Sequence, residues 1–383
     1  MTSKFLPSFV ALVLQIGFLV GCISKKSKDT SDQTIEGTNS LRYAENFSVS
    51  KTPNGVVLTV IEPYKGAPDS RKYLLVNGLD THAENEDYDA VIQVPIQSIA
   101  ATATSQAGFI DALDASDNLA GYSTTDFISS AKIRDRIEAG LIIELGRDAS
   151  INIEALMALS PDMLMAYSAS TDVSQWDQIE TLGIPVVYDA SFLETSPLAQ
   201  AEWIKFFAAF LGKSDQADSI FNNIEQSYVQ LLSLTQNTNI KPTVIGGTMY
   251  NGTWFMPGGK SWVATYIQDA GGTYLWENID QTGSVPLSFE SVFEKSLNVD
   301  FWIGATAYST FDQLVNEDER YLKFKAVRDK TIFSPTKKTN GLGGNDYYES
   351  GVVRPDLVLS DFIKILHPEL QPEKGFNYYK KLE

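Results

Sequence analysis

The sequence predicts an α/β fold of two lobes joined by a long helix, with an extra β-rich segment at the start. Three observations indicate this. From residue 90 onward short apolar runs alternate with helical segments, which is typical of a mostly parallel sheet covered by helices. This alternating pattern is present in the part of the chain before residues 197–236 and again in the part after them. That middle stretch has apolar side chains at helical spacing, so we expect it to connect the two lobes.

The first residues are typical of a secretion signal. Lys4 precedes a mostly apolar run over Phe9–Val20, which is shorter than the roughly 20 apolar residues that a membrane-spanning helix needs. The run ends at Gly21 and Cys22, and this ending resembles a bacterial lipobox. We therefore predict a lipoprotein signal peptide over 1–21 and lipidation of Cys22, which would anchor the chain to a membrane.

Residues 22–40 are rich in Ser, Lys, Asp and Thr, and we expect a flexible tether there. Cys22 is the only cysteine, so a lipidated chain has no thiol for a disulfide, a thiolate metal site or a nucleophile. The formal net charge is −18 and no basic stripe is present, which argues against nucleic acid as a partner.

The segment 42–80 is predicted to be β-rich. Pro53, Asn54 and Gly55 separate two apolar runs, and an Asn-Gly pair in that position favours a hairpin. A third apolar run follows at Tyr73–Val76. We place this segment at the start of the first lobe, as an extension of it.

The first lobe is expected to cover residues 41–195, including the β-rich segment. After residue 90 its pattern suits four units of strand and helix. The expected strands are Ala90–Val94, Leu119–Tyr122, Met163–Tyr167 and Pro185–Tyr188, and the expected helices lie near 105–115, 130–138, 152–159 and 174–182.

The middle segment 196–237 is expected to be helical, and the second lobe to cover 238–383. A helix over 214–236, with Ser214 as its N-cap, would be roughly 34 Å long at 1.5 Å per residue. In the second lobe the expected strands are Thr243–Gly247, Asp300–Ala305 and 331–333, with helices near 261–270 and 310–316.

Several segments, in order, resemble a known family. They are Asn152-Ile153-Glu154-Ala155-Leu156, Met256-Pro257-Gly258-Gly259-Lys260-Ser261-Trp262 and the closing Arg354-Pro355-Asp356-Leu357. In this order, and together with the lipobox, they are similar to class III periplasmic substrate-binding proteins of ABC importers. Members of that family bind cobalamin or iron complexes such as siderophores.

The resemblance implies two Rossmann-like lobes joined by a single long rigid helix. It also implies a non-enzymatic, monomeric lipoprotein that captures an iron-siderophore or cobalamin-type complex between the lobes and delivers it to the permease subunits of an ABC transporter. No cofactor is expected, because the ligand is itself the metal chelate. Glu154 and Glu290 stand where the family has one permease-docking glutamate per lobe. The exported chain would face the periplasm, or the outside of a cell with one membrane.

Ligand contacts are expected at loops that follow strands, where this sequence is rich in aromatic residues. Such rings offer a large contact area, although each could equally pack inside a lobe. A Gly-rich loop with two adjacent tyrosines, and an arginine that could pair with an anionic ligand, are further candidates. The predicted ligand-binding residues are Tyr122, Arg147, Tyr167, Tyr250, Trp254, Tyr347 and Tyr348, with Trp254 the best single candidate.

The sequence argues against a resident metal site and against catalysis. The two histidines, His82 and His367, are far apart, and no nucleophile elbow or zinc-protease motif occurs. Three alternatives remain. One is a periplasmic haem-binding protein with a Tyr as axial ligand. The second is a secreted hydrolase that uses acidic pairs such as Asp111 with Asp114 or Asp87 with Asp89. The third is a lipoprotein adaptor or chaperone that binds a partner protein.

Overall fold

The computed structural model describes residues 41–78, 87–147 and 150–383, apart from the side chain of Arg147. The predicted signal peptide, Cys22, the tether and His82 lie outside the described residues. Residues 37–383 form one compact unit. Among the described helices, none has both the length and the apolar character needed to cross a bilayer.

The β-rich segment forms a four-stranded sheet of order β1-β2-β3-β4. The predicted hairpin is confirmed: β1 (Phe47–Thr52) pairs antiparallel with β2 (Gly55–Val60). Gly55 has a φ of 151°, and a Cβ there would lie 2.0 Å from the carbonyl oxygen of Leu75, so the turn requires glycine. β3 (Arg71–Asn77) is antiparallel to β2 and parallel to β4 (Ala90–Val94).

The prediction for Ala90–Val94 was right about the strand and wrong about its sheet. β4 pairs with β3, whereas the first strand of the lobe's parallel sheet is β5 (Ile99–Ala101). Pro95 and the turn after it separate the two strands, and the amides of Gln97 and Ser98 donate to the carboxylate of Asp162. β5 contains two alanines, so it has little of the β-branched character that identifies strands in a sequence.

The first lobe contains the expected parallel sheet, of order β11-β10-β5-β6-β7. Its other strands are β6 (Leu119–Tyr122), β7 (Ile143–Glu144), β10 (Met163–Ala166) and β11 (Val186–Tyr188). Its helices are α1 (Thr104–Ala112), α2 (Ala131–Glu138), α3 (Ile153–Leu159) and α4 (Ser174–Thr181), and β8 (Gly146–Arg147) pairs with β9 (Ser150–Ile151).

The second lobe has a sheet of order β15-β12-β17-β18-β19, parallel except for β19. These strands are β12 (Thr243–Ile245), β15 (Thr273–Tyr274), β17 (Phe301–Ile303), β18 (Ile332–Ser334) and β19 (Lys380–Lys381). The helices are α8 (Trp262–Asp269), α9 (Phe289–Ser296), α10 (Phe311–Glu317) and α11 (Lys325–Arg328). A small antiparallel sheet that the sequence did not predict contains β13 (Thr248–Tyr250), β14 (Thr253–Pro257) and β16 (Ser284–Ser288).

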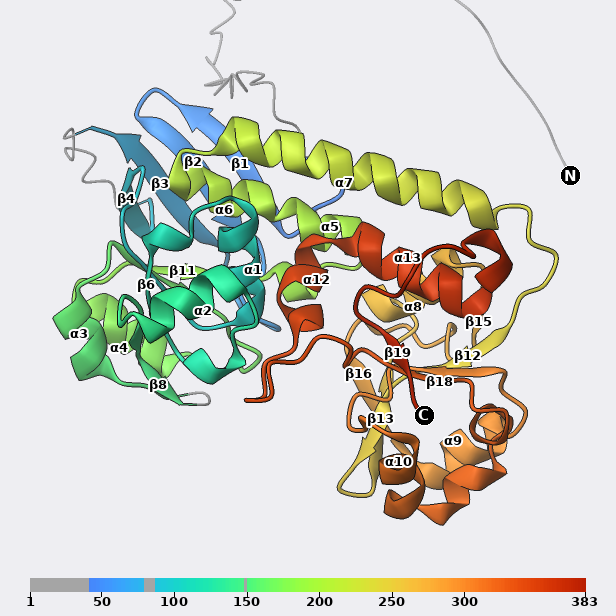
Figure 1. Cartoon of the computed structure of the whole chain (residues 1–383). Helices are drawn as coiled ribbons and strands as arrows, with labels where there is room; N and C mark the ends of the chain where they lie inside the picture. Colours follow the sequence, from blue (N-terminus) through green and yellow to red (C-terminus); the bar gives the residue numbers. More distant parts are fainter. Residues whose placement is uncertain (1–40, 79–86, 148–149) are drawn as a thin grey trace, which may run out of the picture. The chain divides into compact units, whose positions relative to one another are not determined.

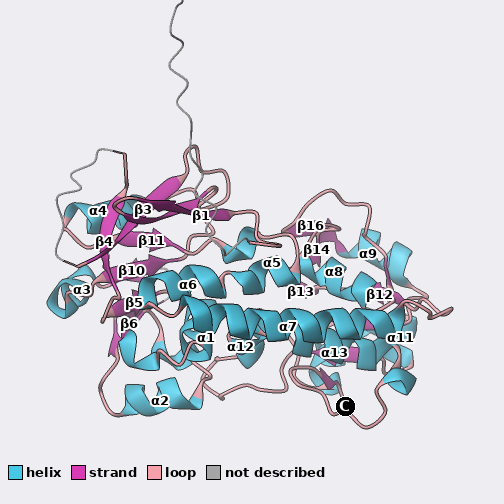
Figure 2. Cartoon of the chain, turned by 90° about the horizontal axis from the view of Figure 1, so that it is seen from above, coloured by secondary structure: helices cyan, strands magenta, loops and turns pink. Residues whose placement is uncertain are grey.

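The long helix α7 (Ser214–Thr235) runs from the first lobe to the second, as predicted (Figures 1 and 2). Its N-cap is Lys213, not the expected Ser214. α5 (Pro197–Glu202) and α6 (Ile204–Leu211) precede it, and α13 (Pro355–Leu366) packs along it. The remaining short helices are η1 (Ser116–Asn118), η2 (Thr125–Phe127), η3 (Ser191–Leu193), η4 (Glu319–Lys323), η5 (Asp346–Tyr348), α12 (Ser350–Val353) and η6 (Pro368–Leu370).

Glu202, at the end of α5, holds the start of the described chain in place. Its fully buried carboxylate accepts hydrogen bonds from the amides of Arg42, Tyr43 and Ala44 at 2.8 to 3.1 Å, and from Lys205 at 2.9 Å. Burial favours the neutral acid, yet these donors hold its pKa below the ordinary value. The N-terminal sheet is therefore fixed to the helices that lead into α7.

Candidate ligand-binding site

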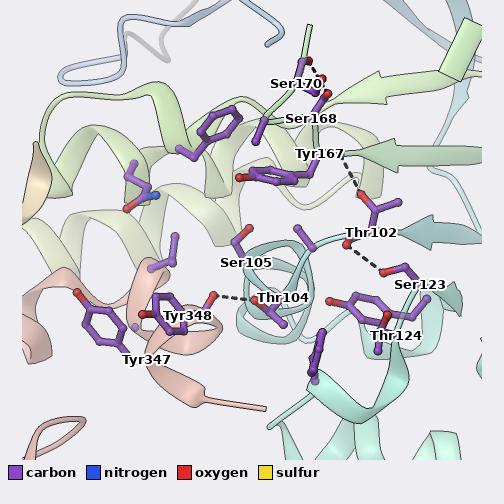
Figure 3. A pocket seen from close by; sticks show the side chains of 18 of the residues that line it. Thr102, Thr104, Ser105, Ser123, Thr124, Tyr167, Ser168, Ser170, Tyr347 and Tyr348 are labelled. Carbon is purple, nitrogen blue, oxygen red and sulfur yellow. Dashed lines mark hydrogen bonds between the residues drawn. The ribbon is translucent and has the colours of Figure 1, made fainter. Parts of the chain in front are cut away.

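A cavity of about 800 Å³ lies between the first lobe and segments of the second half of the chain (Figure 3). The first lobe contributes residues at the carboxyl ends of β5, β6 and β10, where ligands commonly bind in open α/β sheets. The second half contributes Trp262 and Tyr266 of α8 together with Tyr347, Tyr348 and the start of α12. The volume is typical of small-molecule sites.

The wall at the end of β5 is fixed by the start of α1. The side-chain oxygen of Gln106 accepts hydrogen bonds from the amides of Thr102 and Ala103 at 2.8 and 3.0 Å. The hydroxyl of Thr102 donates to the carbonyl of Met165 and accepts from the amide of Tyr167 at 2.9 Å. These bonds connect β5 to β10, so the two neighbouring walls of the cavity form one rigid unit.

The cavity is lined mainly by aromatic rings and hydroxyl groups. Asp172 is the only residue with a formally charged side chain among the described residues that line it. Several hydroxyls already donate within the wall: Ser123 to the carbonyl of Thr102, and Ser168 to the carbonyl of Ser170. The aromatic lining residues are Tyr122, Phe127, Tyr167, Trp176, Phe192, Trp262, Tyr266, Tyr347 and Tyr348. Such walls favour a bulky ligand with little net charge over a small anion.

Four of the predicted ligand-binding residues line this cavity: Tyr122, Tyr167, Tyr347 and Tyr348. Tyr167 and Tyr348 are 36% and 42% exposed, whereas Tyr122 and Tyr347 are buried. Burial raises the pKa of Tyr167, and the nearby Asp189 raises it further. The Tyr167 phenol is therefore protonated at neutral pH and can donate a hydrogen bond.

The placement of Trp254 corrects the sequence prediction. Its side chain is fully buried in the second lobe, its indole nitrogen donates to the carbonyl of Gly246 at 3.0 Å, and its ring lies 4.9 Å from that of Trp302. Tyr250 stands at the end of β13 and is 66% exposed. Neither residue lines the cavity, because β13 and β14 form a hairpin instead of a loop at the sheet edge.

The other predicted candidates lie elsewhere or are not described. The backbone of Arg147 belongs to β8, and its side chain lies outside the described part of the structure. Asp111 and Asp114, suggested as a catalytic pair, do not line the cavity: Asp111 accepts from the hydroxyls of Ser116 and Ser130, and Asp114 pairs with Lys132 at the surface. In the described residues no group of three or more potential metal ligands occurs.

A smaller cavity of about 320 Å³ adjoins the first and shares Trp262, Tyr347 and Tyr348 with it. It lies where β12, β17 and β18 end, since Gly247, Gly304 and Pro335 line it. The three shared aromatic residues form the boundary between the two spaces. The aromatic pair of the Gly-rich loop thus contacts both.

The two predicted docking glutamates occupy equivalent positions in the two lobes. Glu154 lies in the first turn of α3, whose N-cap Asn152 accepts from the amide of Ala155. Glu290 lies in the first turn of α9, whose N-cap Ser288 accepts from the amide of Ser291. Both carboxylates are exposed, and Glu290 lies 3.6 Å from Arg320.

Comparison with known proteins places this architecture in a family. The chain is 25% identical to an uncharacterized lipoprotein of Methanocaldococcus jannaschii over 99% of this chain and 96% of the relative. A periplasmic heme binding protein from Pseudomonas aeruginosa has a TM-score of 0.57 and 17% identity, covering 75% of this chain and 98% of that one. An ABC transporter substrate-binding protein from Listeria monocytogenes has a TM-score of 0.54 and 18% identity, covering 71% and 99%.

These two solved structures share the overall fold of this chain. Residues 99–339 match the family model of the periplasmic binding proteins. The match begins at β5 and ends at Thr339, so it includes the first-lobe segments that line the cavity, and α8, but not Tyr347 and Tyr348. The chain belongs to the periplasmic binding protein family.

Proposed function

We propose that this protein is the ligand-binding component of an ABC importer and that it captures a compact metal chelate of the siderophore or cobalamin type. The observation that carries the proposal is the aromatic, almost uncharged cavity of about 800 Å³ between the lobes. Aromatic faces complement a large, partly apolar chelate whose ionised groups are neutralised by its metal. The family and the ABC-transporter neighbour support this assignment.

A haem-binding protein is the second candidate, favoured by the fold shared with a heme binding protein. Haem in such a site needs an axial ligand. The described residues that line the cavity include tyrosines but no histidine. Tyr167 and Tyr348 have the most exposed phenol rings among the tyrosines of the cavity. Burial raises the pKa of both phenols, so iron would have to displace the phenolic proton.

Intrinsic tryptophan fluorescence tests the proposal, because Trp176 and Trp262 line the cavity. The purified protein is titrated in turn with cyanocobalamin, a panel of ferric siderophores and haemin, with correction for inner-filter absorption. Saturable quenching by a siderophore or by cyanocobalamin supports the proposal. Tight binding of haemin alone, with a Soret shift that Tyr167→Phe or Tyr348→Phe removes, favours the second candidate. Quenching by none of them contradicts both.

The lipid anchor and the permease partner are part of the same proposal. Two curated relatives from Methanocaldococcus jannaschii are named as lipoproteins, which agrees with lipidation at Cys22 after export. A lipid-anchored monomer at the cell envelope could present both lobes to a permease. Exposed carboxylates on the two lobes would then meet basic residues of the permease subunits.

Charge reversal at both predicted docking positions is expected to lower uptake strongly without changing ligand affinity. Glu154→Arg combined with Glu290→Arg replaces two attractions by two repulsions, and each like-charge contact at an interface costs several kcal/mol. Uptake of the labelled ligand by the source cells should fall at least about tenfold, since 1.4 kcal/mol corresponds to a factor of ten. The same double change at the exposed Glu317 and Glu319 serves as the control. Normal uptake by the Glu154/Glu290 variant would contradict the docking role.

A further inference from the structure

Residues 340–349, here called the strap, lie against the first lobe although they belong to the second half of the chain. The side-chain amide of Asn340 donates to the carbonyls of Asp126 and Ile128 at 2.7 and 2.8 Å. The hydroxyl of Thr104 donates to the carbonyl of Tyr348 at 3.2 Å (Figure 3). The strap is therefore held to both α1 and the loop before α2.

This contact joins two walls of the ligand cavity. The strap contributes Tyr347 and Tyr348 to the cavity, and the loop that it contacts contributes Thr124 and Phe127. An opening movement that separates the lobes on this side must break the strap's bonds to the first lobe. The last residue of the strap, Glu349, makes two of those bonds but does not itself line the cavity.

Glu349 places a carboxyl group in the interior of this contact. One of its oxygens accepts from the amide of Ser129 at 2.6 Å, and the other accepts from the amide of Ser130 at 2.8 Å. The residue is 1% exposed. α1 packs closely on the same backbone, since a Cβ on Gly108 would lie 2.3 Å from the carbonyl oxygen of Glu349. The docked strap therefore leaves the carboxyl group with almost no exposure to solvent.

The groups around Glu349 favour its neutral form. Asp346 of η5 and Asp111 of α1 are acidic and disfavour a charge on Glu349, whereas the phenol of Tyr122 on β6 is neutral and has its own pKa raised by Glu349. The nearby cations are engaged elsewhere: Lys338 pairs with Asp346 at 3.2 Å, and Arg134 of α2 donates to the carbonyl of Thr125. Within the described ranges no Lys, Arg or His forms an ion pair with Glu349.

Among the described residues, the hydrogen bonds that compensate for burying this charge come from two amides at the start of α2. An ionised carboxylate that loses its water and has no cationic partner is disfavoured. Burial accordingly raises the pKa of Glu349 to about 7, despite the two amide hydrogen bonds and with a smaller contribution from the neighbouring acids.

We propose that Glu349 binds a proton when the strap docks on the first lobe, so that closure of the cleft on this side is coupled to protonation. The proposal rests on the proposed function only in treating the cavity as the ligand site. Glu349 is a positioning residue, because it acts by holding the strap and its two tyrosines against the first lobe.

The sign of the pH dependence follows from linkage. The docked strap has a pKa of about 7 at Glu349, and the released strap would have the ordinary value of 4.5. The docked state therefore binds the proton more tightly, and docking weakens as the pH rises between these two values. Two-state linkage with these values gives an opening constant about tenfold larger at pH 8 than at pH 6.

Hydrogen exchange of the backbone amides of Ser129 and Ser130 measures this opening directly. Purified full-length protein is studied without ligand at several values of pH from 5.5 to 8.5, and each rate is corrected for intrinsic exchange. We expect the opening constant to rise about tenfold from pH 6 to pH 8. Glu349→Gln, which cannot ionise, should make it independent of pH. Glu319→Gln, the same change at an exposed site, should leave the wild-type dependence intact.

A pH-independent opening constant in the wild-type protein, or the wild-type dependence in Glu349→Gln, would overturn the proposal. Should Glu349→Gln not fold, Asp111→Asn provides the test. Loss of the Asp111 charge should lower the pKa of Glu349 and move the midpoint of the opening curve to lower pH, and an unmoved midpoint would contradict the proposal. No ligand is present in these experiments, so a negative ligand titration leaves their outcome untouched and bears on the proposed function alone.

Discussion

Replacing Ala169 by Trp is expected to weaken ligand binding about 10- to 100-fold, because the indole would occupy the cavity. Ala169 lines the cavity and is exposed, so the larger side chain can extend into the open space without displacing the core. Overpacking a filled site typically costs about 1–3 kcal/mol, and a loss of about 10- to 100-fold in affinity falls within that range. Fluorescence titration with the ligand found in the panel measures the change.

Ala139→Trp is the matched control, since Ala139 is also exposed but lies at the end of α2, away from the cavity. Its affinity should equal that of the wild-type protein. Equal affinities for all three proteins would show that the ligand binds elsewhere. Far-ultraviolet circular dichroism of both variants establishes that any loss of binding does not come from a loss of fold.

Glu202→Ala is expected to lower the free energy of unfolding by about 3 kcal/mol or more. The change leaves three backbone amides without their acceptor and removes the closer of the two carboxylates that pair with Lys205, the other being Asp218 at 3.5 Å. Breaking such a buried ionic cluster typically costs about 3–5 kcal/mol. Urea denaturation at pH 7 measures the difference. Because the pKa of Glu202 lies below its ordinary value, this stabilisation is present at neutral pH and is lost as the pH falls through that depressed pKa.

Glu225→Ala provides the comparison for this prediction. Glu225 contacts the same N-terminal segment, through Arg42 and the hydroxyl of Tyr43, but its side chain is partly exposed. Partly exposed pairs contribute about 1 kcal/mol or less. If the two substitutions lower the free energy of unfolding equally, the buried amide cluster around Glu202 is not what fixes the N-terminal sheet.

The elements with strong local signals were predictable from the sequence. The Asn54-Gly55 pair located the hairpin, since few residues other than glycine adopt the turn's backbone. Apolar residues at helical spacing located α7 to within a residue at each end. In contrast, β5 has an Ile-Ala-Ala sequence that packs in the centre of the sheet, and only tertiary pairing with β6 and β10 identifies it as a strand.

The candidate site was only partly predictable, because its walls come from segments far apart in the chain. Tyr122, the last residue of β6, and Tyr167, the first residue after β10, were found from their place at strand ends. The prediction for Trp254 was wrong because buried and exposed side chains alternate along β14, and Trp254 lies on the buried face. Trp262 could have been found from the helix start, since Ser261 caps α8 and puts Trp262 in its first turn. Phe127 and Phe192 lie in short helical turns that carry no sequence signal of a cavity.

From the proposed transport role we expect the cleft to bind one small molecule and to return it unchanged. Native mass spectrometry tests this directly with the ligand that quenches the protein's fluorescence most strongly, before and after prolonged incubation. We predict a single added mass equal to one intact metal chelate, which is absent from Ala169→Trp at the same concentration and is recovered unaltered on denaturation. The absence of any bound species across the siderophore, cobalamin and haemin panel, or recovery of a chemically altered ligand, would contradict this expectation.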